Sequence, residues 1–267
     1  MKITDIDVYT VDPSKGGTPN SVDYPDIWTF VRVRTDEGVH GWGECTNFPG
    51  NGSLMIADAI HHLKPWIVGQ DAHDVNAMWH RVFRKAAYLG PRGLPTAVVS
   101  ALDIALWDIK GKVAGRPIYD LLGGKVRPSI PTYANGWFYA LDGFSMAKTP
   151  EEYAHAAKRA VGHGHTVVKC DPFLEMEPYH TGYLHGQISP EGEDFGINVI
   201  AAIREAVGPN VGVLLDAHGH YNVPTWVRIC KRLEPYNLGW FEEPTPPESI
   251  QALRSVREQV NVPICVG

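Results

Sequence analysis

The segment VGVLLD at residues 211–216 and the segment LGWFE at residues 238–242 are short apolar runs that each end in a carboxylate. Glu242 follows Asp216 by 26 residues, a spacing typical of one strand–helix repeat. A third apolar run, VPICVG, follows at residues 262–267. The equal spacing predicts parallel strands that end at one edge of a sheet, and it predicts a further acid at position 268, just after Gly267.

The same alternation extends back to about residue 127. Short apolar runs alternate with segments whose apolar residues recur at three- and four-residue spacing, as in amphipathic helices. The predicted strands are residues 130–135, 166–171, 211–216, 238–242 and 262–266, and the predicted helices are residues 150–162, 193–207, 222–234 and 247–260. Strands that alternate with helices in this way indicate βαβ units and a parallel sheet.

The first half of the chain follows a different pattern. Residues 2–11 and 28–46 alternate apolar and polar side chains around a turn sequence, TDEG, at residues 35–38, which predicts an antiparallel meander. Helices are predicted at residues 53–68, 72–88 and 94–114, the last ending at Gly115-Arg116-Pro117. We therefore expect an α+β domain at residues 1–126 and a β/α domain at residues 127–267.

A barrel and a doubly wound sheet both fit the second half. No Gly-x-Gly-x-x-Gly sequence follows a predicted strand, which argues against a dinucleotide fold. Only five strands are predicted where a closed barrel needs about eight, so a barrel would be incomplete. Residues 172–192 form a long insertion, rich in aromatic residues and histidines, at the end of a predicted strand.

Composition limits the classes of partner. The chain has 267 residues, is 44% hydrophobic and carries a net charge of −6 without a basic run, so nucleic acid is not an expected partner. It has no signal-like N-terminus and no run of about 18 apolar residues, which predicts a soluble cytoplasmic protein without membrane contact. Cys45, Cys170, Cys230 and Cys265 are widely separated, which favours free thiols over disulfides or zinc.

Ionisable residues gather at the ends of three predicted strands. Because alternate residues of a strand share a face, Lys169 lies on the same face as Asp171, and Asp216 on the same face as His218. Glu242 ends the next strand. Carboxylates this close do not all stay ionised without a cation, and an all-oxygen set suits Mg²⁺ or Mn²⁺ better than zinc.

Each of these residues also has a structural interpretation. Asp216 could cap the next helix, Glu242 could belong to a solvated turn, and Lys169 could extend from the sheet into solvent. Five such residues at matching strand ends are harder to explain by structure alone, so we interpret them as a site.

The remaining histidines carry less weight. His163 and His165 precede a strand and so lie at the opposite edge, where a surface position is expected. His61 and His62 are expected to be structural. Four further features could line a pocket or have only structural roles: His180, His185, His220 and the aromatic run at residues 137–139.

Three segments resemble signatures of one family. They are AVVSALDIALWDIKGK at residues 97–112, PIYDLLGG at residues 117–124 and FEEP at residues 241–244. In this order they resemble the mandelate racemase and muconate lactonizing enzyme branch of the enolase superfamily. The resemblance implies an α/β protein: an α+β capping domain on a modified (β/α)₇β barrel, of which about five strands are present.

The resemblance also implies roles for residues. Asp216 and Glu242 match the first two of three Mg²⁺ ligands, and the third is expected just after Gly267. Where the family often has Lys-x-Lys, this chain has Lys169-Cys170-Asp171, which disfavours a racemase with two opposed bases. His218 resembles the general acid of sugar-acid dehydratases of the galactonate type, whose base is a histidine on a later strand.

These matches imply that Lys169, Asp171 and His218 act in catalysis on a small sugar acid. The implied reaction removes the proton α to a carboxylate and eliminates water to give a 2-keto-3-deoxy acid. The alternatives are a cycloisomerase, racemase or epimerase of the same superfamily, or an inactive truncated form. Residues 15–26 and 46–52 are expected to set specificity, and a homo-oligomer is expected.

Overall fold

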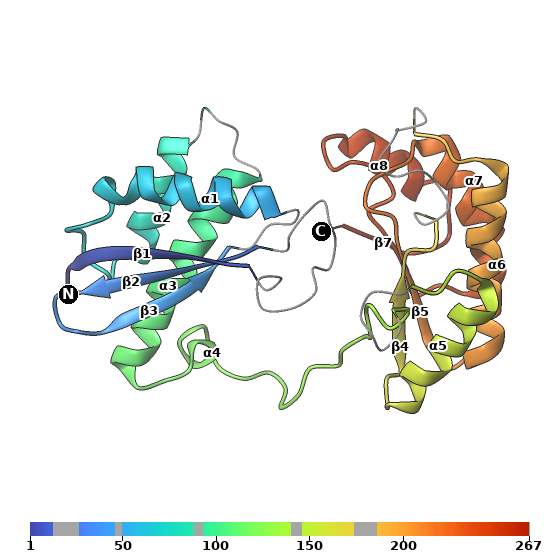
Figure 1. Cartoon of the computed structure of the whole chain (residues 1–267), viewed down its shortest axis with the longest axis horizontal. Coiled ribbons are helices and arrows are strands. Elements are labelled where there is room, and N and C mark those ends of the chain that lie inside the picture. The colour runs from blue at the N-terminus through green and yellow to red at the C-terminus, as the bar shows by residue number, and fades with distance from the viewer. Residues whose placement is uncertain are drawn as a thin grey trace. The chain divides into compact units, whose positions relative to one another are not determined.

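The computed structural model describes residues 1–12, 27–45, 50–86, 88, 93–139, 146–173 and 186–266. The expected specificity segment at residues 15–26, the first four residues of the second expected segment at 46–52, and His180 and His185 lie outside these described residues. The chain forms two compact units, residues 1–128 and residues 129–267 (Figure 1).

Unit 1 contains a three-stranded antiparallel sheet in the order β1-β2-β3, with helices packed against it. Its elements are β1 (Ile3–Val11), β2 (Trp28–Thr35), β3 (His40–Glu44), α1 (Gly50–Leu63), the 3₁₀ turn η2 (Lys64–Trp66), α2 (Val75–Ala86), α3 (Leu94–Ala114) and α4 (Ile118–Leu121). The predicted meander and the helix at residues 94–114 are confirmed.

Helix α3 lies unusually close to strand β3. A Cβ on Gly43 would come within 2.0 Å of the backbone oxygen of Ala101, so no larger residue fits at this crossing. The small residues Ala101 and Ala105 of α3 are fully buried there. Close backbone approach therefore explains why a predicted strand contains glycines at alternate positions.

Unit 2 contains a parallel sheet in the order β4-β5-β6-β7. Its elements are α5 (Pro150–Gly162), β4 (Val167–Cys170), α6 (Pro190–Val207), β5 (Gly212–Asp216), α7 (Val223–Leu233), the 3₁₀ turn η4 (Glu234–Tyr236), β6 (Trp240–Glu242), α8 (Ile250–Arg257) and β7 (Ile264–Cys265). This alternation confirms the predicted α/β class; the described residues form four strands rather than a closed barrel.

Every helix of unit 2 begins at a capping side chain. The caps are Thr149, Ser189, Asn222 and Ser249, and each accepts a hydrogen bond from a backbone amide three residues later. Proline follows the first three caps in the first helical turn, where its missing amide costs nothing. Helix α6 consequently begins at Pro190, three residues before its predicted start.

The two faces of the parallel sheet have different roles. Helices α5, α6 and α7 lie along one side of the sheet in Figure 1. Val168, Leu215 and Phe241 point to this side and pack into the hydrophobic core with Trp226 of α7. Residues one position away, such as Lys169, consequently lie on the opposite face.

The prediction of a strand at residues 130–135 is wrong. It is not a strand in the structure; its only sheet pairing among the described residues is a parallel bridge between Ala134 and Val168. Pro128 and Pro131 have no amide hydrogen to donate, and Ile130 is 74% exposed, so neither pairing nor burial favours an extended ladder there.

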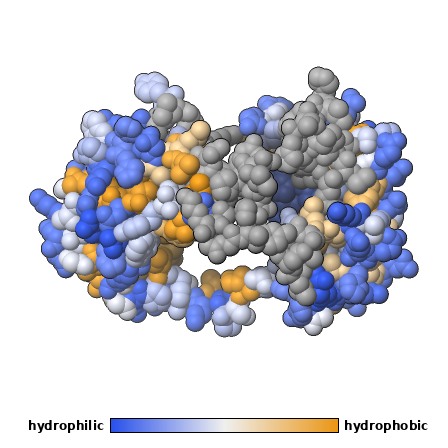
Figure 2. Space-filling view, viewed as in Figure 1, coloured by the Kyte–Doolittle hydropathy of each residue, from blue (hydrophilic) through white to orange (hydrophobic). Residues whose placement is uncertain are grey.

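The segment that joins the two units is exposed. Leu122, Val126 and Ile130 are all largely accessible, and the segment shows hydrophobic patches along the lower edge of Figure 2. Among the described residues, no helix is both long and apolar enough to cross a membrane.

Candidate active site

Strands β4, β5 and β6 end side by side, and their register brings their polar residues together. Lys169 pairs with Leu214 across β4 and β5, and Asp216 pairs with Glu242 across β5 and β6. Paired residues of parallel strands point to the same face, so Lys169, Asp216 and Glu242 share the face turned away from the helices. Asp171 follows β4 directly and lies at the same edge.

Lys169 lies between two carboxylates. Its Nζ is 2.8 Å from Oδ2 of Asp216 and 3.2 Å from Oε1 of Glu242. Burial by itself lowers the pKa of Lys169, but the hydrogen bonds and negative charges of the two acids outweigh this effect and hold the pKa above its usual value. Lys169 is therefore a cation at neutral pH.

Asp171 and His218 form a second pair. Nδ1 of His218 lies 2.6 Å from Oδ2 of Asp171 and 3.7 Å from Oδ1 of Asp216. The hydrogen bond to Asp171 raises the pKa of His218, burial opposes it, and the charges of Asp171, Asp216 and Glu243 add to the increase. An ionised carboxylate only accepts hydrogen bonds, so Nδ1 carries the proton and the other ring nitrogen, Nε2, is left for another partner. The side chain is about half exposed.

Two residues here have left-handed backbones although they are not glycine. His218 has φ of 48° and Glu243 has φ of 45°, values that cost a side-chain-bearing residue energy. The amide of Gly219 donates a 2.8 Å hydrogen bond to the backbone oxygen of Glu243, which joins the two loops. Such outliers are commonest at functional sites.

Sequence reasoning missed three residues of this face. The indole Nε1 of Trp240 donates a 2.9 Å hydrogen bond to Oε2 of Glu242. The ring of Tyr133 meets Trp240 edge-on at 5.7 Å and lies 5.4 Å from the Lys169 ammonium. Cys265 pairs with Glu242 across β6 and β7. The two-residue spacing of Trp240 and Glu242 was a signal that could have found the first of these.

The structure also locates the other histidines. His220 is half-buried, and burial, followed by the charge of His218, lowers its pKa; the two rings lie 6.4 Å apart. His163 lies in an exposed turn before β4, as expected from the sequence, and His165 follows it. His62 is exposed on α1, 3.6 Å from Asp58.

The donor atoms suit a hard divalent cation. Asp216 and Glu242 converge on a single cationic nitrogen, so their oxygens can face one positive centre. Asp171, Asp216 and His218 form an overlapping group whose ligand atoms lie within 4.8 Å of one another. Carboxylate oxygens are the ligands that Mg²⁺ prefers.

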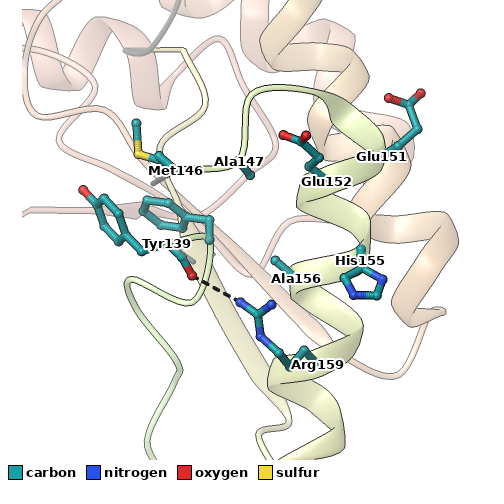
Figure 3. A pocket seen from close by; sticks show the side chains of 9 residues that line it. Tyr139, Met146, Ala147, Glu151, Glu152, His155, Ala156 and Arg159 are labelled. Carbon is teal, nitrogen blue, oxygen red and sulfur yellow. Dashed lines mark hydrogen bonds between the residues drawn. The ribbon is translucent and has the colours of Figure 1, made fainter. Parts of the chain in front are cut away.

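A separate hollow of about 420 Å³ lies between residues 138–139 and helix α5 (Figure 3). Two of its polar groups make contacts within the fold: Arg159 donates to the backbone oxygen of Tyr139 at 3.2 Å, and Glu152 accepts from the amide of Lys148 at 2.6 Å. The strand-end residues do not line it.

Known proteins match both units. The mandelate racemase/muconate lactonizing enzyme N-terminal domain matches residues 20–123, and the enolase C-terminal domain-like family matches residues 152–267. A solved structure of a member of the enolase superfamily from Salmonella Typhimurium matches with a TM-score of 0.89 and 32% identity, covering 100% of this chain and 67% of that one.

Two curated relatives have named activities. The D-galactonate dehydratase of Pectobacterium atrosepticum is 33% identical over 100% of this chain and 61% of its own length. The D-galactarolactone cycloisomerase of Agrobacterium fabrum is 32% identical over 89% of this chain and 56% of its own length. The chain thus spans less than two thirds of the length of either relative.

An α+β unit followed by a parallel β/α unit with acids at the carboxyl edge of its sheet is the architecture of the enolase superfamily. The chain belongs to the mandelate racemase and muconate lactonizing enzyme branch of that superfamily. Sites of the superfamily use a lysine or histidine base together with one or two Mg²⁺ ions.

Proposed function

We propose that this chain acts in the Mg²⁺-dependent dehydration of a sugar acid. The observation that carries the proposal is the meeting of a lysine, two acids and an acid–histidine pair at the ends of three adjacent strands. The name of the D-galactonate dehydratase relative supports the same reaction class.

We propose Asp216 and Glu242 as the residues that hold the metal, because their carboxylates already face one cation. A bound divalent metal stabilises the negative charge that develops on a carboxylate when its α proton is removed. Mn²⁺ is an alternative because it accepts the same oxygen ligands.

Lys169 is proposed as the protein's own positive charge beside the substrate carboxylate. Its raised pKa keeps it protonated, which suits a group that stabilises developing negative charge rather than one that removes a proton. Positioned donors of this kind contribute most where water is excluded, and Lys169 is only 7% exposed.

His218 is proposed as the general acid. The α proton passes first to a base, for which the family resemblance implies a histidine on a later strand. In the elimination step the bond between the β carbon and its hydroxyl oxygen then breaks, His218 gives a proton to that oxygen, and water leaves. The enol product then becomes a 2-keto-3-deoxy acid. Asp171 holds Nδ1, and the raised pKa of His218 favours the imidazolium with a proton on both ring nitrogens, so the Nε2 proton of the half-exposed ring is available to the leaving group.

The direct test is a dehydration assay of the purified chain with Mg²⁺ and a panel of epimeric aldonic and aldaric acids. A 2-keto-3-deoxy product that forms with one acid, and that disappears when the metal is chelated, supports the proposal. Saturable Mg²⁺ binding without any product from the panel would oppose it.

A cycloisomerase is the second candidate, because one relative carries that name. It shares the proton abstraction but uses the enediolate differently. Deuterium incorporation at the α carbon from heavy water, or conversion of a sugar-acid lactone, without loss of water would favour this alternative.

A further inference from the structure

Tyr221 lies at the far end of the loop that carries His218 and is only 6% exposed. Its hydroxyl donates a 3.0 Å hydrogen bond to the backbone oxygen of Phe173, two residues after Asp171. We propose that Tyr221 is a positioning residue that holds His218 against Asp171. The role that this gives Tyr221 in turnover rests on the proposed function, whereas its effect on the His218–Asp171 contact does not.

The acceptor of this hydrogen bond is firmly placed. The ring of Phe173 is fully buried and meets Trp226 edge-on at 5.6 Å. On its other side lies Gly196 of helix α6, where a Cβ would come within 2.3 Å of the ring. The Phe173 side chain therefore has little room to move unless the helices move with it.

The hydrogen-bond donor, Tyr221, packs against Trp226, as Phe173 does. The ring of Tyr221 meets Trp226 at 5.0 Å with an interplanar angle of 77°. Trp226 thus contacts both residues of the hydrogen bond, and it is itself fully buried. A hydroxyl held at this distance and this depth links the loop after β5 to the loop after β4.

Among the described residues, three hydrogen bonds join the two connections. They are the 2.6 Å contact of His218 with Asp171, the bond of Tyr221 with Phe173, and a 2.7 Å bond from the amide of Asn222 to the backbone oxygen of Gly186. His218 needs this support because its left-handed backbone, with φ of 48°, is unfavourable by itself. Loss of the Tyr221 hydroxyl removes the one of these bonds that reaches Phe173, two residues from Asp171, and the imidazole then has more freedom to leave Asp171.

The test uses Tyr221→Phe in the full chain, which keeps the ring and its packing and removes only the hydroxyl. Histidine side chains are observed by long-range ¹H–¹⁵N NMR without metal, and His218 is assigned by the signals lost in His218→Asn. At a pH where the ring of His218 is neutral, we expect the parent to show a protonated, hydrogen-bonded Nδ1, and Tyr221→Phe to show a mixture of tautomers. Tyr236→Phe, at the opposite end of the sheet, is the matched control.

A second variant reaches the same hydrogen bond from its acceptor side. Gly196→Ala displaces the Phe173 ring and with it the carbonyl, so we expect the same change in the His218 signals. Unchanged His218 signals in Tyr221→Phe, with or without a lower melting temperature, would overturn the proposal, because Tyr221 would then have a structural role only. If Tyr221→Phe did not fold, unchanged signals in Gly196→Ala would overturn it.

Turnover gives a separate readout. If the chain dehydrates a sugar acid, we expect Tyr221→Phe to lower kcat by roughly tenfold with little change in KM, less than the roughly 10²-fold cost of a 1 Å misplacement. If no acid is dehydrated, the proposed function fails while the NMR result still decides the role of Tyr221. A rise in KM as large as the expected fall in kcat, with kcat itself unchanged, would contradict the positioning role.

Discussion

Lys169 and Asp216 form a buried ion pair, with 2.8 Å between Nζ and Oδ2 and with side chains that are 9% and 8% exposed. Glu242 joins the same ammonium from the next strand at 3.2 Å. Removal of one partner from such a pair leaves an uncompensated buried charge, which is far more costly than removal of a surface ion pair. The charge balance of this face consequently depends on Lys169, on a bound cation, or on both.

Lys169→Met is therefore expected to lower the free energy of unfolding by about 3–5 kcal/mol in the absence of metal, because two carboxylates lose their cation. Added Mg²⁺ should restore more stability to this variant than to the parent, since metal binding is linked to folding. Urea unfolding with chelator and with Mg²⁺ measures both effects. Lys158→Met, on the exposed side of α5, is the control. Equal stability of variant and parent in chelator would contradict the expectation.

His218→Asn should lower dehydration by roughly 10²–10⁴-fold, the usual contribution of a positioned general acid. The proton α to the carboxylate should still exchange with solvent, because that step precedes loss of the leaving group. Parallel measurement of keto-acid product and of deuterium incorporation separates the two steps. Full dehydratase turnover in this variant would remove His218 from the mechanism.

Trp240→Phe should weaken divalent metal binding by roughly 10–100-fold, the usual effect of losing a residue that orients a metal ligand. The indole hydrogen bond to Oε2 of Glu242, at 2.9 Å, is lost while most of the packing remains. Titration with Mn²⁺, followed by electron paramagnetic resonance, gives the affinity directly. Trp66→Phe, at an exposed tryptophan of unit 1, is the control. An affinity equal to that of the parent would show that Trp240 does not orient Glu242.

Glu193→Gln tests an ion cluster between α6 and α7. Glu193 is 5% exposed and accepts hydrogen bonds of 2.8 Å from both Arg228 and Arg232. Burial alone raises its pKa, but the two arginines outweigh this effect and hold the pKa below the usual value near 4.5. A lowered pKa means that the charged form favours folding above the unfolded-state pKa, and that this contribution is lost as pH falls through the folded-state pKa.

The variant should therefore lose about 1–2 kcal/mol at pH 7, because the arginines are themselves partly exposed and screened, and lose much less near pH 3. Urea unfolding at the two pH values measures the difference. Glu191→Gln, exposed in the same helical turn, should change little at either pH. An equal loss at both pH values would assign the effect to packing rather than to charge.

Much of the fold could be predicted because the relevant signals are local. The turn at residues 35–38 acts on its immediate neighbours, so its effect is readable from the chain. The cap Ser189 acts just as locally, but it was missed, and the helix was predicted to begin three residues late. The segment at residues 130–135 was predicted wrongly as a strand, because an apolar run beside prolines does not show whether neighbouring strands will pair with it. Ladder pairing is a tertiary property.

The candidate site, like the fold, could be predicted only in part. The two-residue period of a strand was enough to put Lys169 with Asp171, and Asp216 with His218, on shared faces. It did not indicate that Lys169 would lie between Asp216 and Glu242, since that contact depends on the register of three strands. Nor did it indicate that Glu242 would contact the lysine and Asp171 the histidine, with Asp216 close to both.

The sequence by itself determined the order of strands and helices, the parallel sheet, and the group of ionisable residues at its carboxyl edge. These follow from the periodicity of apolar residues and from turn sequences, which act within a few residues. The tertiary structure decided the contacts of Lys169, the pairing of Asp171 with His218, and the hydrogen bond of Tyr221 with Phe173. These contacts join residues 47 to 73 positions apart, and the register of the strands, together with the packing of the helices against the sheet, determines which of them meet.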